Sequence, residues 1–206
     1  MRILRAQDYR EMPWKNGKGA TREIATHPEG ASLDGFLWRI SMAQVNAPGP
    51  FSVFHDCDRI LCVVRGGPLH LSIAGAEPVR LGMDSPPFHF AADVAAEVTA
   101  LEEQVLDFNV MVRRNDYGAS VEYCRGPVAL SESSHARVVF VREGAARTEE
   151  GEILQRGDTL LADGKRTRIT AGDSTVLYVV TMIAKVPLEC DGVHHSPRTA
   201  SSIPTR

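Results

Sequence analysis

A dense polar stretch near the start of the chain has the residue types of a small-molecule site. It reads MPWKNGKGATREIATHPEG, residues 12–30, and places Trp, Lys, Asn, Thr, Arg and Glu within ten positions. A phosphate-binding P-loop needs the spacing GxxxxGK followed by Ser or Thr, between a strand and a helix. This stretch lacks that spacing, and no helix pattern follows it. Asn16-Gly17 is a strong turn dipeptide. A turn alone leaves four neighbours unexplained: Lys15, Thr21, Arg22 and Glu23.

An arginine at the start of an apolar strand is the second candidate. Arg59 follows Asp58 in GPFSVFHDCDRIL, residues 49–61. A planar guanidinium can bind a carboxylate through two hydrogen bonds, so an inward-facing Arg59 would be an anion site. An ion pair between Arg59 and a nearby Asp or Glu explains the same residues, and the sequence leaves both interpretations open.

The third candidate is a polar pair on a predicted strand. Side chains of a strand alternate between its two faces, so in VLDFNVMVRRND, residues 105–116, Asp107 and Asn109 share one face. The other face is apolar and carries Phe108, Val110 and Val112. The polar pair can point into the lumen of a barrel, or it can lie on the solvated face of a sheet, which is the more common arrangement.

Metal sites and nucleophiles are poorly supported. His55-x-Cys57 resembles a degenerate HxH pair and His89 is a possible third ligand, but no Glu follows at a short interval, so the ligand set is incomplete. No G-x-S-x-G elbow is present, and the four cysteines are irregularly spaced without a CxxC. We therefore predict no catalytic residue, no metal and no cofactor.

Strands are predicted to position these side chains. Period-two alternation bounded by Gly and Pro predicts strands within 36–45, 59–67, 68–78 and 88–114 and, after Arg114, within 136–144, 152–164 and 167–183. Helix propensity would favour a helix over AADVAAEVTALEE, residues 91–103. Its neighbours are strands, so we predict strand and turn there. The polar tail, residues 188–206, is predicted to be flexible.

Composition excludes several classes of partner. The 206 residues carry 23 basic and 26 acidic side chains, a net charge of −3, which gives no electrostatic footprint for nucleic acid and no basic run for a membrane surface. No apolar run reaches the ~18 residues of a membrane span, and the N-terminus lacks a signal-peptide core. We expect a cytoplasmic protein with reduced thiols, and a homodimer is left open.

Four pieces of the chain together resemble the HutD/Ves family, which is found beside histidine-utilisation enzymes in bacteria. They are WKNGKGATREI (14–24), WRISMAQV (38–45), GPFSVFHDCDRILCVVRGG (49–67) and a segment that ends in LDFNVMVRR (86–114). The order of these motifs is specific, and the resemblance covers nearly the whole chain, from about Arg2 to Ile183.

The resemblance implies an all-β bicupin, with two small β-barrel or jelly-roll cupin domains packed together. The restart of the strand pattern agrees with domains at 1–116 and 117–187. The family lacks the usual cupin metal ligands. This chain departs from the family pattern at Lys18, where the family often has Gly, and within 54–56 and 90–93.

The family is regarded as non-catalytic or of uncertain activity, and is thought to moderate histidine catabolism by binding N-formylglutamate or urocanate. Such a carboxylate needs a cation and positioned polar groups. A metal-dependent cupin isomerase, dioxygenase or hydrolase acting on a small carboxylate is the alternative, and a structural bicupin that acts only through a partner protein is left open. The candidate ligand-binding residues are Lys15, Asn16, Thr21, Arg22, Glu23, Arg39, Ser52, Arg59, His89, Asp107 and Asn109.

Overall fold

The chain folds almost entirely into strands. A computed structural model describes residues 1–162 and 164–185, and the predicted flexible tail lies outside these ranges. Within them are nineteen strands and one short 3-10 helix. No helix in this part of the chain is long and apolar enough to cross a membrane. The predicted all-β class is confirmed.

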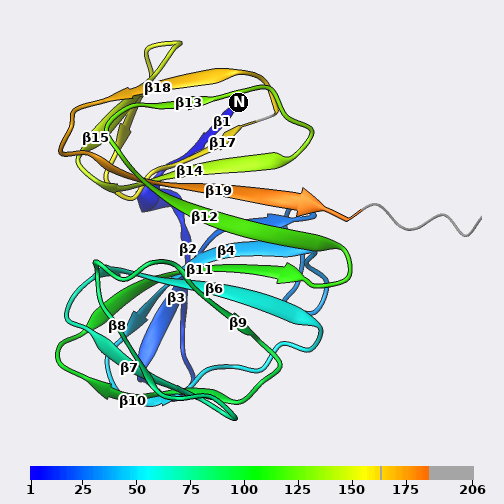
Figure 1. Ribbon diagram of the computed structural model, residues 1–206, viewed down its shortest axis with the longest axis vertical. Helices are drawn as coiled ribbons and strands as arrows, with labels where there is room; N and C mark the ends of the chain where they lie inside the picture. The colour runs from blue at the N-terminus through cyan, green and yellow to red at the C-terminus, as the bar shows by residue number, and fades with distance from the viewer. Residues whose placement is uncertain (163, 186–206) are drawn as a thin grey trace, which may run out of the picture.

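The first group of strands forms a two-sheet sandwich, in the lower half of Figure 1. Its larger sheet has the order β2-β3-β4-β11-β6-β9 and its smaller sheet the order β5-β10-β7-β8. All of its paired strands are antiparallel. The bounds are β2 Arg10–Pro13, β3 Gly19–His27, β4 Trp38–Val45, β5 Gly49–Pro50, β6 Cys57–Arg65, β7 Leu69–Ile73, β8 Val79–Leu81, β9 Phe88–Ala91, β10 Ala96–Leu101 and β11 Val105–Arg113.

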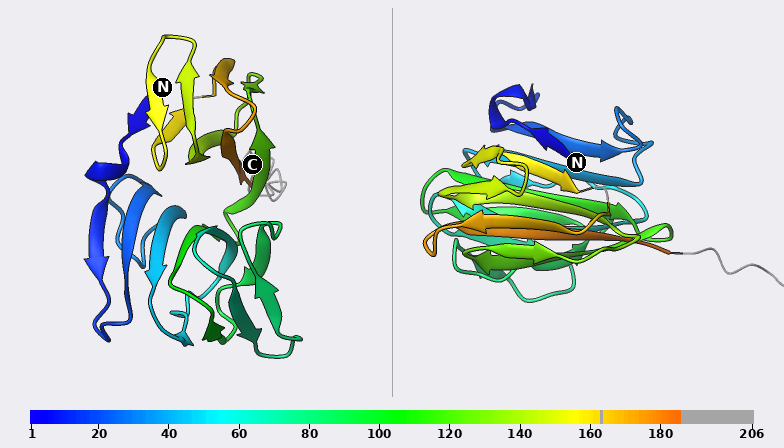
Figure 2. Two further views of the ribbon diagram at one scale, coloured as in Figure 1. Left: turned by 90° about the vertical axis from the view of Figure 1, so that its left-hand side faces the viewer. Right: turned by 90° about the horizontal axis from the view of Figure 1, so that it is seen from above.

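The second group forms another sandwich above the first (Figure 1; Figure 2). Its sheets have the orders β1-β17-β14-β19-β12 and β13-β18-β15-β16. Strand β1 begins the chain but pairs with β17 here. The bounds are β1 Arg2–Leu4, η1 Ala6–Asp8, β12 Tyr117–Arg125, β13 Val128–Leu130, β14 Ala136–Glu143, β15 Ala145–Thr148, β16 Ile153–Gln155, β17 Thr159–Ala162, β18 Thr167–Ala171 and β19 Val176–Ala184. The domain division at residues 116 and 117 stays a prediction.

The largest apolar core lies between the two large sheets. The apolar face of β4, which carries Trp38, Ile40 and Met42, belongs to it. Phe108 of β11 is fully buried there, with its ring centroid 4.8 Å from that of Phe140 on β14. Alternation along residues 38–43 of the sequence places Trp38, Ile40 and Met42 on one face of a strand, and this face packs into the core between the large sheets.

The opposite faces of β4, β6 and β11 point into the first sandwich. One part of this interior is filled by a separate apolar cluster that includes Leu61, Leu71 and Val105. The turn and strand predicted for residues 91–103 are also confirmed, because β10 begins only at Ala96 and pairs with β7 to close the smaller sheet. The apolar cluster leaves space at the other end of the sandwich, where polar side chains gather.

Candidate functional site

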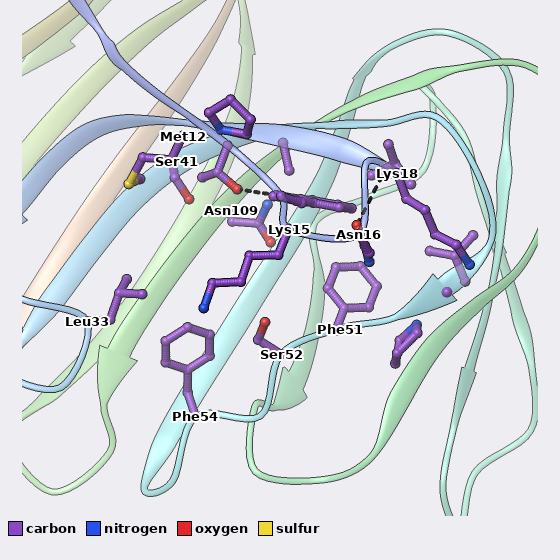
Figure 3. A pocket seen from close by; sticks show the side chains of 18 of the residues that line it. Met12, Lys15, Asn16, Lys18, Leu33, Ser41, Phe51, Ser52, Phe54 and Asn109 are labelled. Carbon is purple, nitrogen blue, oxygen red and sulfur yellow. Dashed lines mark hydrogen bonds between the residues drawn. The ribbon is translucent and has the colours of Figure 1, made fainter.

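A pocket of about 510 Å³ opens at that end of the first sandwich. Strands β4, β6 and β11 form one wall, the β2–β3 hairpin overhangs it, and the segment that follows β5 crosses its mouth (Figure 3). The polar side chains that line it are Lys15, Asn16, Lys18, Thr21, Arg39, Ser41, Ser52, Arg59 and Asn109. Seven of these are among the residues predicted from the sequence.

The WKNGKG stretch is the turn of the β2–β3 hairpin. Gly17 donates its backbone N–H to Trp14 O at 3.0 Å, and the Lys18 N–H donates to Asn16 Oδ1 at 3.0 Å. Gly17 has a φ of +68°, in the left-handed region that favours glycine. Trp14 Nε1 also donates to Thr21 Oγ1 at 2.8 Å. The Asn16-Gly17 turn is thus confirmed, and it folds Trp14 over the pocket.

Gly19 allows the hairpin to lie close to β4. A Cβ at this position would lie 2.1 Å from Gln44 O and 3.0 Å from the Trp14 ring. We expect Gly19→Ala to lower the free energy of unfolding by about 1–3 kcal/mol, because backbone must move to admit the methyl group. Gly118→Ala is the matched control, since Gly118 lies in strand β12 with open space around it. Equal urea-unfolding midpoints for the two variants would contradict the close approach.

Lys15 is a cation of the β2–β3 hairpin without a polar partner among the described residues. It forms no hydrogen bond or ion pair with the residues that the structure describes, and its side chain extends into the pocket toward Ser52 and Phe54 (Figure 3). Lys18 differs, because its Nζ donates to Pro48 O at 2.9 Å and so ties the hairpin to the rim of the pocket. Lys15 can therefore reach an anion in the pocket without breaking a salt bridge.

Arg39 is a buried cation that already has a counter-charge. Its Nε lies 2.8 Å from Glu23 Oε2, and one of its terminal nitrogens donates to Ser41 Oγ at 3.3 Å. Glu23 stands on β3 beside β4, where the strand pairing places its carboxylate against Arg39. The pair contributes little net charge to the pocket.

Arg59 is buried without a salt bridge. Its residue exposure is 4%, and no carboxylate of residues 1–162 or 164–185 lies within ion-pair distance. Its guanidinium carbon lies 5.0 Å from the centre of the Phe51 ring and 5.6 Å from those of Phe54 and Phe90. Burial lowers the pKa of Arg59 to about 10, so it is still charged at neutral pH. Arg59 therefore faces the interior of the sandwich, and its role as an anion site stays a prediction.

One terminal nitrogen and Nε of Arg59 differ in their hydrogen bonding. One terminal nitrogen donates to Ser52 O at 3.2 Å, which ties the guanidinium to the segment across the mouth. The buried Nε has no hydrogen-bond partner. A buried donor without a partner costs free energy, so this guanidinium is prepared to donate to an anion.

Asp107 and Asn109 lie side by side on the inner face of β11. Asn109 lines the pocket, and its amide nitrogen donates to Asp107 Oδ1, which also accepts from the Ala43 N–H at 3.1 Å. Asp107 is completely buried next to the charge of Arg59. The polar face of β11 thus points into the sandwich interior and not to solvent, which decides between the two sequence-based alternatives.

The free energy of unfolding is expected to depend on pH through Asp107. Burial raises the pKa of Asp107 to about 7 from an ordinary value of 3.8. Between these values the folded protein holds a proton that the unfolded chain has released, so the stability contribution is complete below about pH 4 and is lost as pH rises to about 7. Relative to Asp107→Asn, the wild type should lose about 1.4 kcal/mol per pH unit in urea unfolding between about pH 5 and 6.5. A constant difference would contradict this.

Four of the predicted residues do not line the pocket, and two of these lie away from it. Arg22 points to the outside of the hairpin, where its exposed side chain pairs with Glu11 at 2.6 Å. His89 is exposed on the edge strand β9. We assign neither residue to the site. Glu23 and Asp107 lie behind it, in contact with Arg39 and Asn109.

Phe51 and Phe54 are pocket residues that the sequence reasoning missed. Both lie in the segment that follows β5, and both rings lie against Arg59. One sequence pattern could have identified them. Two aromatic residues lie close to Ser52, just before the strand that carries Arg59. Their rings shield the guanidinium from solvent, which strengthens its attraction for an anion.

The Arg113-Arg114 pair holds the loops around the mouth. Arg113 donates to three backbone carbonyls, Asp34 O at 2.6 Å, His55 O at 2.8 Å and Phe36 O at 3.2 Å. These carbonyls come from the two loops that precede β4 and β6. Arg114 is paired with Asp58 and Asp93 instead. The pair has a structural role at the edge of the pocket.

Metal ligands do not converge in the part of the chain that the structure describes. No three side chains of His, Cys, Asp or Glu form a group there that could hold a metal ion. His55, Cys57 and His89, which the sequence suggested as possible ligands, do not form such a group. The pocket instead offers guanidinium, ammonium, hydroxyl and amide groups, which suit binding of an organic anion.

Comparison with known sequences identifies relatives of this chain. A family model described as HutD matches residues 6–179. The uncharacterised 21.2 kDa protein in the hutC 3′ region of Pseudomonas putida is 36% identical over 140 residues, which are 68% of this chain and 73% of that protein. Protein Ves of Citrobacter koseri is 34% identical over 182 residues, which are 83% of this chain and 90% of that protein.

Solved structures show the same fold. HutD from Pseudomonas fluorescens SBW25 superposes with a TM-score of 0.79 at 28% identity, covering 90% of this chain and 99% of that one. Oxalate decarboxylase of Bacillus subtilis superposes with a TM-score of 0.61 at 10% identity, covering 88% of this chain and 77% of that one. The second likeness concerns the fold alone. The predicted all-β cupin fold is confirmed.

Proposed function

The chain belongs to the HutD family, and on this premise we propose that it is a non-catalytic binding protein that regulates histidine utilisation. Its ligand would be a carboxylate intermediate of that pathway, N-formylglutamate or urocanate, bound in the pocket of the first sandwich. A relative in Pseudomonas putida is named for its position in the hutC 3′ region, which supports the link to this pathway.

The observation that carries the proposal is the state of Arg59. Arg59 is buried and forms no salt bridge with any described residue. The acidic group near it is Asp107, whose pKa is raised to about 7, so this carboxyl is partly protonated at neutral pH. A bound carboxylate would supply a full negative charge and hydrogen-bond acceptors. The aromatic rings of Phe51 and Phe54 exclude water from the guanidinium. A carboxylate would therefore bind Arg59 in a low-dielectric setting, where the attraction is strong.

The remaining polar groups fit the rest of such a ligand. Lys15 reaches the pocket from the hairpin and can neutralise a second carboxylate, as in N-formylglutamate. Thr21 accepts from Trp14, which leaves its own hydroxyl hydrogen free to donate to a carbonyl or formyl oxygen. A volume of about 510 Å³ lies within the ordinary range for small-molecule pockets.

Calorimetric titration of the purified chain tests the proposal. We expect saturable binding of N-formylglutamate, urocanate or both at one site, with the ligand recovered unchanged by chromatography after a long incubation. Glutamate is the matched control for the formyl group of N-formylglutamate. Absence of binding by both acids would contradict the proposed ligand class. Conversion of a bound acid to product would contradict the non-catalytic role and favour a cupin enzyme.

A further inference from the structure

The pocket contains two buried polar atoms of opposite character that lack partners. Arg59 Nε is a donor and Asn109 Oδ1 is an acceptor, and neither has a hydrogen bond. Both residues line the pocket. Because buried polar groups are nearly always paired in folded proteins, a donor and an acceptor left open in one pocket indicate a ligand that supplies both an acceptor and a donor.

Asp107 determines which end of the Asn109 amide is left open. Its Oδ1 accepts from the Asn109 amide nitrogen and from the Ala43 backbone N–H at 3.1 Å. The carboxyl group is thereby fixed to the backbone of β4, and the amide nitrogen is fixed to the carboxyl group. The carbonyl oxygen of Asn109 is then the group that the amide can offer to a ligand.

We infer that Asp107 is a positioning residue that orients the Asn109 amide, so that its carbonyl oxygen selects anions which also carry an N–H donor. This inference rests on the proposed function, since it assumes that the pocket binds an organic anion. Asp107 itself does not line the pocket. The ligand class is an acid whose carboxylate binds Arg59 and whose N–H group donates to Asn109.

An anion of the same shape without the N–H group should bind less well. It would keep the attraction of Arg59 but leave Asn109 Oδ1 buried and unpaired, as it is in the free protein. Sites built to hydrogen-bond a ligand group discriminate strongly against analogues that lack it. We expect a preference of about tenfold or more for the donor-bearing acid.

The matched probes are urocanate and 3-(2-furyl)acrylate. Both are planar acrylates with a five-membered ring, and only urocanate carries a ring N–H. Titrations at about pH 8 keep Asp107 ionised, above its pKa of about 7, and keep the imidazole neutral. The wild type should bind urocanate about tenfold more tightly than furylacrylate. Equal affinities for the two acids would overturn the inference and leave the proposed function standing.

Two substitutions at Asp107 separate positioning from charge. Asp107→Asn keeps the acceptor oxygen, so the preference for urocanate should persist even if the affinities for both acids rise together. Asp107→Leu removes that oxygen and the charge, so the preference should fall to about twofold or less, with furylacrylate still bound. Loss of the preference in Asp107→Asn, or its persistence in Asp107→Leu, would contradict the assignment.

A third variant covers the case in which Asp107→Leu does not fold. Asn109→Ala removes the acceptor directly and should abolish the preference while Arg59 still binds both acids. A preserved preference in this variant would overturn the inference. If the wild type binds neither acid, the proposed ligand class fails and this inference fails with it, which differs from the result of equal affinities.

Discussion

Replacing Arg59 with methionine is expected to weaken binding of N-formylglutamate or urocanate by about a hundredfold. Removal of a buried, charged partner of a carboxylate costs about 2–5 kcal/mol, and 2.7 kcal/mol corresponds to a hundredfold change in Kd. Methionine keeps an unbranched side chain under the rings of Phe51 and Phe54, so the variant should fold. Calorimetric titration of wild type and variant measures the change.

The matched control for Arg59→Met is Arg22→Met. Arg22 is an exposed arginine of the same sheet that pairs with Glu11 and lies outside the pocket. Its substitution should change the ligand Kd by less than about twofold, because Arg22 is exposed outside the pocket and solvent screens its charge from a bound ligand. Equal effects of the two substitutions, with both proteins folded by circular dichroism, would show that Arg59 is not the anion site.

Truncation of Phe108 to alanine is expected to give the largest loss of stability. The side chain is fully buried between the two large sheets, and its ring centroid lies 4.8 Å from that of Phe140 and 5.6 Å from that of Tyr178. Loss of a buried phenylalanine costs about 3–5 kcal/mol through lost burial and the cavity that remains. Urea unfolding followed by tryptophan fluorescence and by circular dichroism measures the change.

Ile153→Ala provides the comparison for Phe108→Ala. Ile153 is 43% exposed on strand β16, away from the central core. A surface truncation of this kind should change the free energy of unfolding by about 0.5 kcal/mol or less. If the two variants lost similar stability, the packing between the two large sheets would not be the main apolar core of the protein.

Alternation along the strands was enough to predict which residues share a face. It separated Trp38, Ile40 and Met42 from Arg39 and Ser41, and it placed Asp107 with Asn109. The physical reason is that side chains of a strand alternate strictly between two faces. With the recognised motifs, this was sufficient for the cupin fold and for most of the polar pocket.

Local patterns could not show which polar residues reach the pocket. Arg22 and Glu23 are adjacent in sequence, yet one pairs with Glu11 on the outside and the other with Arg39 on the inside. His89 has a side chain that could bind a ligand. However, its strand β9 lies at the edge of the sheet, and His89 is exposed there. These outcomes depend on sheet order and curvature, which a single strand does not encode.

Long-range strand pairing was also hidden from the sequence. Strand β1 opens the chain, but Arg2 pairs opposite Leu161 in the second sandwich. The contact between Arg59 and Phe90 likewise depends on the pairing of β6 with β9. Such contacts form between segments far apart in the chain, so neither composition nor periodicity predicts them.

A crystal structure of the chain with N-formylglutamate or urocanate would test the central claim most directly. The proposal that Arg59 is the anion site predicts a ligand carboxylate within hydrogen-bond distance of the Arg59 guanidinium, between the β2–β3 hairpin and the rings of Phe51 and Phe54. A ligand bound elsewhere, or a pocket in which the Arg59 guanidinium contacts no ligand oxygen at saturating concentration, would contradict it.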